Sequence, residues 1–283
     1  MHRIGDHARG SAKVHTKSRP KGHTLLELTI AIALGLAITM GAVALYRSQR
    51  AAFTAAADQE RMREAGMAAL VLIGDQIQMA GFVPAPTPTG QVAMPLFGCA
   101  GARPIGPDDA LACEALPGSA SSDGLAVRYI GDGVSTWPSA TGQPTDCLGQ
   151  SVADSEAGLN AGSATIVNRY YAKTSSSTGE PELYCEGTGR PGVAQPLVEG
   201  VERLRVRYWL AGVQEAVEAS AVARDQWSRV VGVDVCAQVR GSSTGRRVRY
   251  VDCDGVPVEP SDGRARTTFS RYVTVRNSPA KSP

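Results

Sequence analysis

Histidine is missing from most of this chain of 283 residues, because all four histidines lie among the first 23, at His2, His7, His15 and His23. The rest of the chain therefore cannot provide an imidazole for a Ser-His-Asp triad, a Cys-His pair or a His-ligated zinc site. Aromatic residues are also few, at 5%. No two cysteines have the CxxC spacing of a zinc site or a thioredoxin-like motif. Because no catalytic motif is present, we expect no enzyme activity, no cofactor and no metal site.

A strong net charge is lacking too, since 29 basic residues face 27 acidic ones. The balance is uneven along the chain: six basic residues and one acid, Asp6, lie in residues 1–22, so the remainder is net negative. A negative main part argues against nucleic-acid binding through bulk charge. Gly and Pro, at 31 and 17, indicate many loops in a chain that is still globular in composition.

One long apolar run is present, LLELTIAIALGLAITMGAVALY at residues 25–46. It has about the 20 residues that a helix needs to cross a bilayer. Glu27 is its only charged residue. The basic segment before the run is expected to stay cytoplasmic by the positive-inside rule, so the bulk of the protein should lie on the far side of the membrane.

Three interpretations of this run compete. It is a signal anchor, or a secretory signal cut after Ala42-Val43-Ala44, or a prepilin segment. In a prepilin, a basic leader ends in Gly, the cut falls before the apolar run, and the fifth residue of the mature chain is Glu. The sequence KGHTLLE at residues 21–27 has this arrangement, and the run is longer than a secretory h-region. We therefore favour the prepilin interpretation.

Glu27 is an expensive residue to place in a membrane, at about 2.5–3.5 kcal/mol even on the lenient insertion scale. It is either a tolerated acid near the headgroups or a residue with a partner. If cleavage after Gly22 frees the amine of His23, that cation can pair with Glu27 of a neighbouring subunit in a helical bundle. We favour this second role, because an acid inside a membrane segment is by default a functional candidate.

The helical pattern continues beyond the membrane run. No proline occurs in residues 47–80, and small and apolar residues recur there at three- and four-residue steps, at Met62, Ala65, Ala69, Leu70, Ile73, Ile77 and Ala80. This predicts one helix over residues 23–80 that ends at the GFVP sequence of residues 81–84. Gly66 and Gly74 are expected to allow close packing or bending.

Short β-like runs separated by Gly, Pro, Ser and Asp follow residue 84. The predicted strands are 124–130, 163–171, 183–185, 201–209, 230–240, 247–252 and 267–275. Residues 201–209 should alternate between the two faces of a strand. One face should carry Val201, Arg203, Arg205, Arg207 and Trp209, and the other Glu202, Leu204, Val206 and Tyr208. The pattern predicts an α+β fold, with a long N-terminal helix packed on an antiparallel β-sheet head.

Four parts are therefore expected. They are a cleaved basic leader (1–22), a transmembrane or filament-core helix (23–46), an amphipathic continuation of that helix (47–81) and a β-rich head on the far side of the membrane (82–283).

Six cysteines lie in the head, at Cys99, Cys113, Cys147, Cys185, Cys236 and Cys253. An even count beyond a membrane segment favours disulfides in an oxidising compartment. Cys236 and Cys253 are expected to lie on adjacent predicted strands and are the best pair. Cys99–Cys113 and Cys147–Cys185 then follow by proximity along the chain. Each bridge is expected to contribute about 2–4 kcal/mol.

Three groups in the head allow a functional interpretation beside a structural one. Arginines that could grip DNA phosphates occur at 203, 205 and 207 and at 246, 247 and 249. An ion-paired strand face is favoured, because 26 acids lie beyond residue 22.

Calcium ligands are conceivable at Asp252, Asp254, Glu259 and Asp262, but the spacing is not that of an EF-hand, and turn formation explains it. Trp137, Trp209 and Trp227 could form an adhesive surface, but packing is favoured for at least two of them.

The N-terminal KGHTLLEL sequence resembles the class III signal of type IV prepilins. Longer motifs resemble, in order, those of the PilW-type minor pilins: REAGMAALVLIGDQIQMAGF, SDGLAVRYIGDG, TDCLG, LYCEG, QPLVEGVERLRVRYW, VVGVDVCAQVRG and FSRYVTVRN. They cover most of residues 23–277. Two positions depart from the family pattern. The residue after the cut is usually Phe and here is His23, and Ala44 stands where many major pilins have a helix-kinking Pro.

This resemblance implies a minor pilin that helps to start type IV pilus assembly. Prepilin peptidase would cut between Gly22 and His23 and methylate the new amine of His23, and Glu27 would serve subunit docking. The partners would be other minor pilins, the major pilin and the inner-membrane assembly platform. The protein would reside in the inner membrane with a periplasmic head and later in the pilus, at its tip. The alternatives are a J-type pseudopilin of type II secretion and a membrane-anchored periplasmic adhesin or DNA-binding module.

Overall fold

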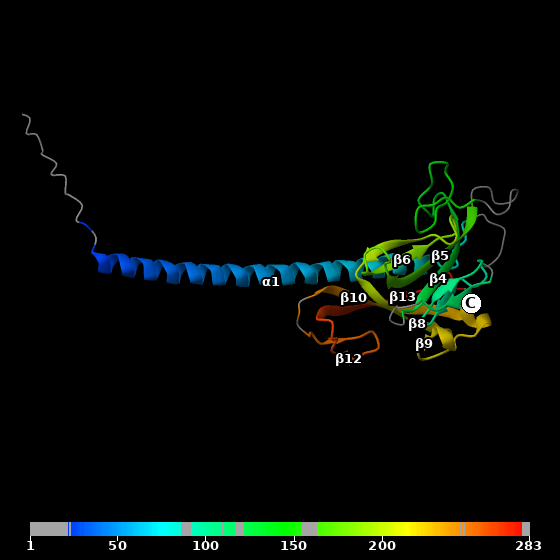
Figure 1. Ribbon diagram of the computed structural model, residues 1–283. Coiled ribbons are helices and arrows are strands. Elements are labelled where there is room, and N and C mark those ends of the chain that lie inside the picture. The colour runs from blue at the N-terminus through cyan, green and yellow to red at the C-terminus, as the bar shows by residue number, and fades with distance from the viewer. Residues whose placement is uncertain are drawn as a thin grey trace, which may run out of the picture. The chain divides into compact units, whose positions relative to one another are not determined.

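The computed structural model describes residues 22, 24–85, 92–108, 110–116, 122–153, 163–243, 245 and 247–278. The chain divides into two compact units, Met1–Thr54 and Ala55–Pro283. One helix, α1 (Leu25–Met79), runs from the first unit into the second (Figure 1). The helix is continuous at Ala44, as the absence of proline there predicts.

The part of α1 that belongs to the second unit buries the predicted stripe. Six of the seven residues of the stripe predicted between Met62 and Ala80 are buried, and the seventh, Ala65, is partly buried. Asp58 anchors the start of this part, because its carboxylate accepts hydrogen bonds from the Ser242 backbone N–H (3.0 Å) and hydroxyl (2.8 Å). At the other end, the Asn277 amide donates to the carbonyl oxygen of Ala80 (3.3 Å), just beyond the last turn. Periodic apolar side chains and two polar anchors thus attach the helix to the head.

Gly66 is required by close packing, and we expect Gly66→Ala to destabilise the head. A Cβ at this position would lie 2.1 Å from Cδ2 of Phe269. The expected overpacking cost of about 1–3 kcal/mol outweighs the gain in helix propensity, so the melting temperature should fall by about 2–8 °C. Thermal unfolding of the detergent-solubilised full chain, followed by near-UV circular dichroism, measures this change. Gly35→Ala is the matched control, since no atom lies within 4 Å of its Cβ position. Equal melting temperatures for the two variants would disprove the packing argument.

Two antiparallel sheets form the body of the head (Figure 1). The five-stranded sheet has the order β1 (Leu96–Cys99), β4 (Gly124–Asp132), β5 (Ser163–Thr174), β6 (Pro181–Glu186) and β7 (Ala194–Glu199). The four-stranded sheet has the order β13 (Arg264–Thr274), β10 (Val230–Ser243), β8 (Val201–Leu210) and β9 (Val217–Glu218).

Smaller elements complete the head. Two hairpins are formed by β2 (Arg103–Ile105) with β3 (Ala112–Glu114) and by β11 (Tyr250–Val251) with β12 (Pro257–Val258). The 3-10 helices η1 (Ala219–Ala221) and η2 (Arg224–Arg229) lie between β9 and β10.

A single large core joins both sheets to the helix. Leu70 and Ile73 of α1 are buried together with Leu125 and Tyr170 of the five-stranded sheet and with Val235 of the four-stranded sheet. The α+β fold that the sequence predicted, a long helix packed on an antiparallel head, is therefore confirmed.

All seven predicted strands fall on observed strands, although 247–252 contributes only the two residues of β11. The prediction missed β1, β2, β3, β7, β9 and β12, which are two to six residues long. Runs this short carry almost no period-two signal, so their pairing depends on neighbours that are distant in the sequence.

The predicted faces of β8 are correct from Arg203 onward and wrong before it. Val201 is fully buried instead of lying with the arginines. The reason is a bulge: Gln238 pairs with Arg203 and Val239 pairs with Val201, so Glu202 has no residue opposite it and the alternation reverses. Glu202 is thereby directed to Arg266, whose Nε lies 2.7 Å from the Glu202 Oε2 atom.

Three disulfides join Cys99 to Cys113, Cys147 to Cys185 and Cys236 to Cys253, which are the three predicted pairs. The geometric reason given for the third pair was wrong, however. Cys236 lies on β10, whereas Cys253 lies in the turn of the separate hairpin β11–β12 and not on a neighbouring strand of the same sheet. This bridge therefore ties a hairpin to the face of the four-stranded sheet.

Candidate functional site

The first candidate site is the N-terminal end of α1, where Glu27 lies in the first helical turn. The Glu27 Oε2 atom accepts a hydrogen bond from the Thr24 backbone N–H (2.9 Å), and the Thr24 hydroxyl accepts one from the Glu27 backbone N–H (3.3 Å). This reciprocal pair is a capping box, which satisfies two amide groups that a helix start leaves open. The carboxylate also lies at the positive end of the helix dipole.

The capping box is a role of Glu27 that the sequence analysis missed, although the Thr-x-x-Glu spacing is its usual signature. Gly22 is exposed, and His23, at the predicted cut, lies outside the described residues. The helix begins two residues after that position.

Apolar side chains from Leu25 to Tyr46 are exposed around the whole helix, among them Leu25, Ile38, Met40 and Leu45. Leaving such side chains in water costs about 1.5–3 kcal/mol for each large residue. By length and composition, α1 contains a segment that could cross a membrane. This segment therefore needs lipid or other helices around it.

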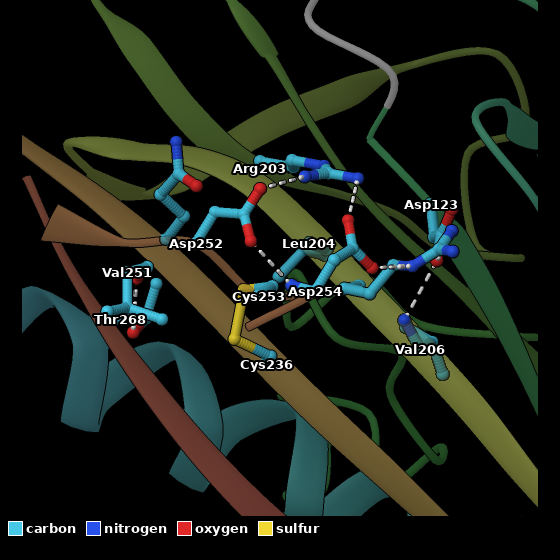
Figure 2. The surroundings of a disulfide bond; sticks show 12 residues. Asp123, Arg203, Leu204, Val206, Cys236, Val251, Asp252, Cys253, Asp254 and Thr268 are labelled. Carbon is cyan, nitrogen blue, oxygen red and sulfur yellow. Dashed lines mark hydrogen bonds and ion pairs between the residues drawn. A yellow bond between two sulfur atoms is a disulfide. The ribbon is translucent and has the colours of Figure 1, made fainter. Parts of the chain in front are cut away.

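The second candidate site is the outer face of β8, where Arg203, Arg205 and Arg207 surround Asp254. Figure 2 shows Arg203 and Asp254 of this group. The Asp254 carboxylate lies 2.8 Å from Nη2 of Arg203 and 2.8 Å from Nε of Arg205, and 3.5 Å from Nη2 of Arg207. Glu218 of β9 pairs with Arg205 as well. The arrangement supports the ion-paired interpretation of this strand over phosphate binding.

The remaining arginines of the DNA hypothesis are Arg246, Arg247 and Arg249, of which Arg247 is exposed. Arg249 pairs with Glu259, with 3.0 Å between Nε and Oε2. Arg246 lies outside the described residues. 

The turn that supplies Asp254 is organised by Asp252 and by the disulfide of Cys253. The Asp252 Oδ1 atom accepts hydrogen bonds from the backbone N–H groups of Asp254 (2.9 Å) and Val256 (2.8 Å), as Figure 2 shows for Asp254. The second oxygen of Asp252 lies 3.9 Å from Nη1 of Arg203. Both carboxylates are thus used for turn formation and ion pairing, and the described residues contain no cluster of three or more groups suited to a metal ion.

The arginines change the ionisation of Asp254. Partial burial works to raise the pKa of its carboxyl group, but the hydrogen bonds and positive charge of Arg203 and Arg205 outweigh this effect. The pKa therefore lies below its ordinary value, and the carboxylate remains charged at neutral pH.

Asp123 is a structural residue that the sequence analysis did not single out. Its buried carboxylate accepts hydrogen bonds from the backbone N–H groups of Gly101 (2.8 Å) and Val206 (2.9 Å). Its backbone N–H donates to the carbonyl oxygen of Leu204 (2.9 Å). Burial raises the pKa of Asp123 in spite of these bonds. Asp123 thus joins the start of β4 to β8, which accounts for the Asp of the SDG sequence at residues 122–124.

The three tryptophans have different environments. Trp227 is buried and packs edge-on against Tyr208, with 4.9 Å between ring centroids. Trp209 packs against Tyr272 and donates its indole N–H to Asp234 (2.7 Å). Trp137 is different, because it is 88% exposed. Packing thus accounts for two of the three.

One comparison with known proteins, a match to a family model, agrees with the resemblance seen in the sequence. The family model described as Type IV Pilus-assembly protein W, PilW, matches residues 169–277. That segment begins in β5 and includes the whole four-stranded sheet, but not α1. Among solved structures, the type IV-like pilin TTHA1219 from Thermus thermophilus is similar at 13% identity and a TM-score of 0.38, covering 77% of this chain and 98% of that chain. No curated protein matches the chain.

Proposed function

We propose that this PilW-type chain is a minor pilin that takes part in starting type IV pilus assembly. The observation that carries the proposal is the apolar segment with Glu27 as its only charge, joined to a head in which residues 169–277 match the PilW model. The role is assembly and not catalysis. Its partners are the other minor pilins, the major pilin and the inner-membrane assembly platform.

Processing of the N-terminus comes first in this scheme. Prepilin peptidase hydrolyses the Gly22–His23 peptide bond, which leaves a carboxylate on Gly22 and a free amine on His23. It then transfers a methyl group from a methyl donor to that amine, which loses a proton. The basic leader of residues 1–22 is removed. Residues 23–46 hold the subunit in the inner membrane, residues 47–81 continue the helix, and the head of residues 82–283 lies in the periplasm until the subunit enters the pilus, where it occupies the tip.

Docking then depends on Glu27. In the single chain its carboxylate caps its own helix through the Thr24 N–H. In the filament, the same carboxylate pairs with the N-terminal amine of a neighbouring subunit. A charged pair is favoured there over a carboxylate alone, because an unpaired charge among apolar helices is costly.

The N-terminal residue and mass of the mature protein, with and without prepilin peptidase, test this proposal. We expect a peptidase-dependent start at His23, heavier by about 14 Da when methylated. An intact Met1, or a start at Leu45, would remove the free amine beside Glu27 and overturn the assembly mechanism. Deleting the gene and scoring surface pili against exoprotein release then separates a pilus from a type II secretion machine.

A further inference from the structure

A loop that follows β4 presents two large apolar side chains to solvent. Val134 is 94% exposed and Trp137 is 88% exposed. Neither side chain is explained by the core or by the ion pairs of the head. Exposed apolar groups side by side mark binding sites when they are held in place, since a soluble surface otherwise avoids them.

The loop is held by hydrogen bonds within itself. The Asp132 Oδ1 atom accepts from the backbone N–H groups of Val134 (3.0 Å) and Ser135 (2.7 Å). The Thr136 hydroxyl donates to the carbonyl oxygen of Asp132 (2.8 Å), and the Thr145 hydroxyl donates to that of Trp137 (2.5 Å). A loop organised in this way loses little conformational entropy when a partner binds.

Trp137 lines a hollow of about 690 Å³ between this loop and the last turns of α1. The helix contributes Leu72, Asp75, Gln76 and Met79 to the opposite wall. This volume is in the range of sites that receive a side chain or a small ligand.

The charge of the hollow has one sign. Among the described residues that line it, Asp75 and Asp146 are acidic, and none is Lys, Arg or His. The sequence between Arg128 and Arg169 contains four carboxylates and no basic residue at all. Asp146 is occupied by the backbone N–H groups of Leu148, Gln150 and Gly189. Asp75 is exposed and has no hydrogen bond or ion pair to another described residue, so its carboxylate is available.

We propose that this hollow receives an arginine side chain of a protein partner. A guanidinium group stacks on an indole ring and pairs with a carboxylate, which Trp137 and Asp75 supply, and its apolar stem fits against Leu72 and Met79. Trp and Arg are also the residues that dominate protein interfaces. The acidic lining excludes phosphate-bearing ligands. This inference does not depend on the pilus proposal.

Fluorine NMR of the full chain in detergent, with 5-fluorotryptophan at all three tryptophans, tests the inference directly. The Trp137 resonance is assigned with Trp137→Phe. The probe is the peptide acetyl-Gly-Arg-Gly-amide, and its neutral control contains citrulline in place of arginine. We expect a saturable shift of the Trp137 resonance with the arginine peptide, while the resonance of the buried Trp227 stays in place.

The variants make the test specific. Asp75→Asn should weaken peptide binding by about fivefold, as expected for loss of an exposed ion pair. Glu60→Gln is the matched control, because it removes an exposed acid from the same helix outside the hollow and should leave binding unchanged. A Trp137 resonance that stays in place up to about 10 mM peptide, or that shifts equally with citrulline, overturns the inference. A shift with chitotriose and none with the arginine peptide would assign the hollow to glycans instead.

Discussion

Glu27→Gln is expected to leave the protein inserted in the membrane and cleaved after Gly22, but to lower its incorporation into pili by at least about tenfold. Breaking an ion pair in an apolar interior costs about 3–5 kcal/mol, and 1.4 kcal/mol already corresponds to a tenfold change. Glutamine can still complete a capping box, so the helix start should persist. Immunoblots of sheared pili and of the membrane fraction measure the two pools.

A matched control separates the charge of Glu27 from its capping role. Thr24→Ala removes the hydroxyl that caps the helix, at a cost of about 1 kcal/mol, but keeps the carboxylate. We expect this variant to enter pili normally. Wild-type incorporation of Glu27→Gln would refute the pairing with a neighbouring amine, and loss of incorporation in Thr24→Ala alone would show that the helix cap, and not the charge of Glu27, controls incorporation.

Replacing both Cys236 and Cys253 with Ala is expected to lower the melting temperature of the head by about 6–12 °C. The bridge closes a loop with a sequence separation of 17 residues, for which about 3 kcal/mol is expected. It also holds the turn that carries Asp254 against three arginines of β8. Losing the bridge therefore also loosens the ion pairs. Thermal unfolding of the detergent-solubilised full chain under non-reducing conditions measures the change.

Asp254→Asn is the companion variant, because it weakens the ion pairs and keeps the disulfide. We expect a smaller decrease in melting temperature, since the Asp254 side chain is partly exposed to solvent. A decrease as large as that of the double Cys variant would show that the bridge acts only by positioning the carboxylate. An unchanged melting temperature in the double Cys variant would contradict the stabilising role of the bridge.

Local patterns in the sequence were sufficient for the elements whose physics is local. The apolar run and the three- and four-residue spacing predicted α1, which ends at Met79 where a helix to residue 80 was expected. Gly66 and Gly74 were expected to allow close packing, and both face side chains of β13. Alternation identified the five longest strands, β4, β5, β8, β10 and β13, because each carries its own period-two signal over several residues.

The partners of the charged residues could not be read in the same way. Asp254 is 47 to 51 positions from the arginines that it contacts, and Asp123 is 83 positions from Val206. With 26 acids available beyond residue 22, composition predicts ion pairing but not which acid is used. The choice depends on the hairpin β11–β12 being tied to β10 by Cys236–Cys253.

The bulge in β8 and the hollow beside Trp137 also depend on contacts between segments that are distant in the sequence. The bulge at Glu202 belongs to the pairing of β8 with β10, and the sequence of β8 alone does not predict it. The hollow beside Trp137 needs both the loop after β4 and the last turns of α1, which are more than 50 positions apart in the chain. The periodic burial of a helix or strand and the end of a helix depend on short stretches of sequence. Ion-pair partners, strand register and cavities depend on segments that are distant in the sequence and meet only in the folded head.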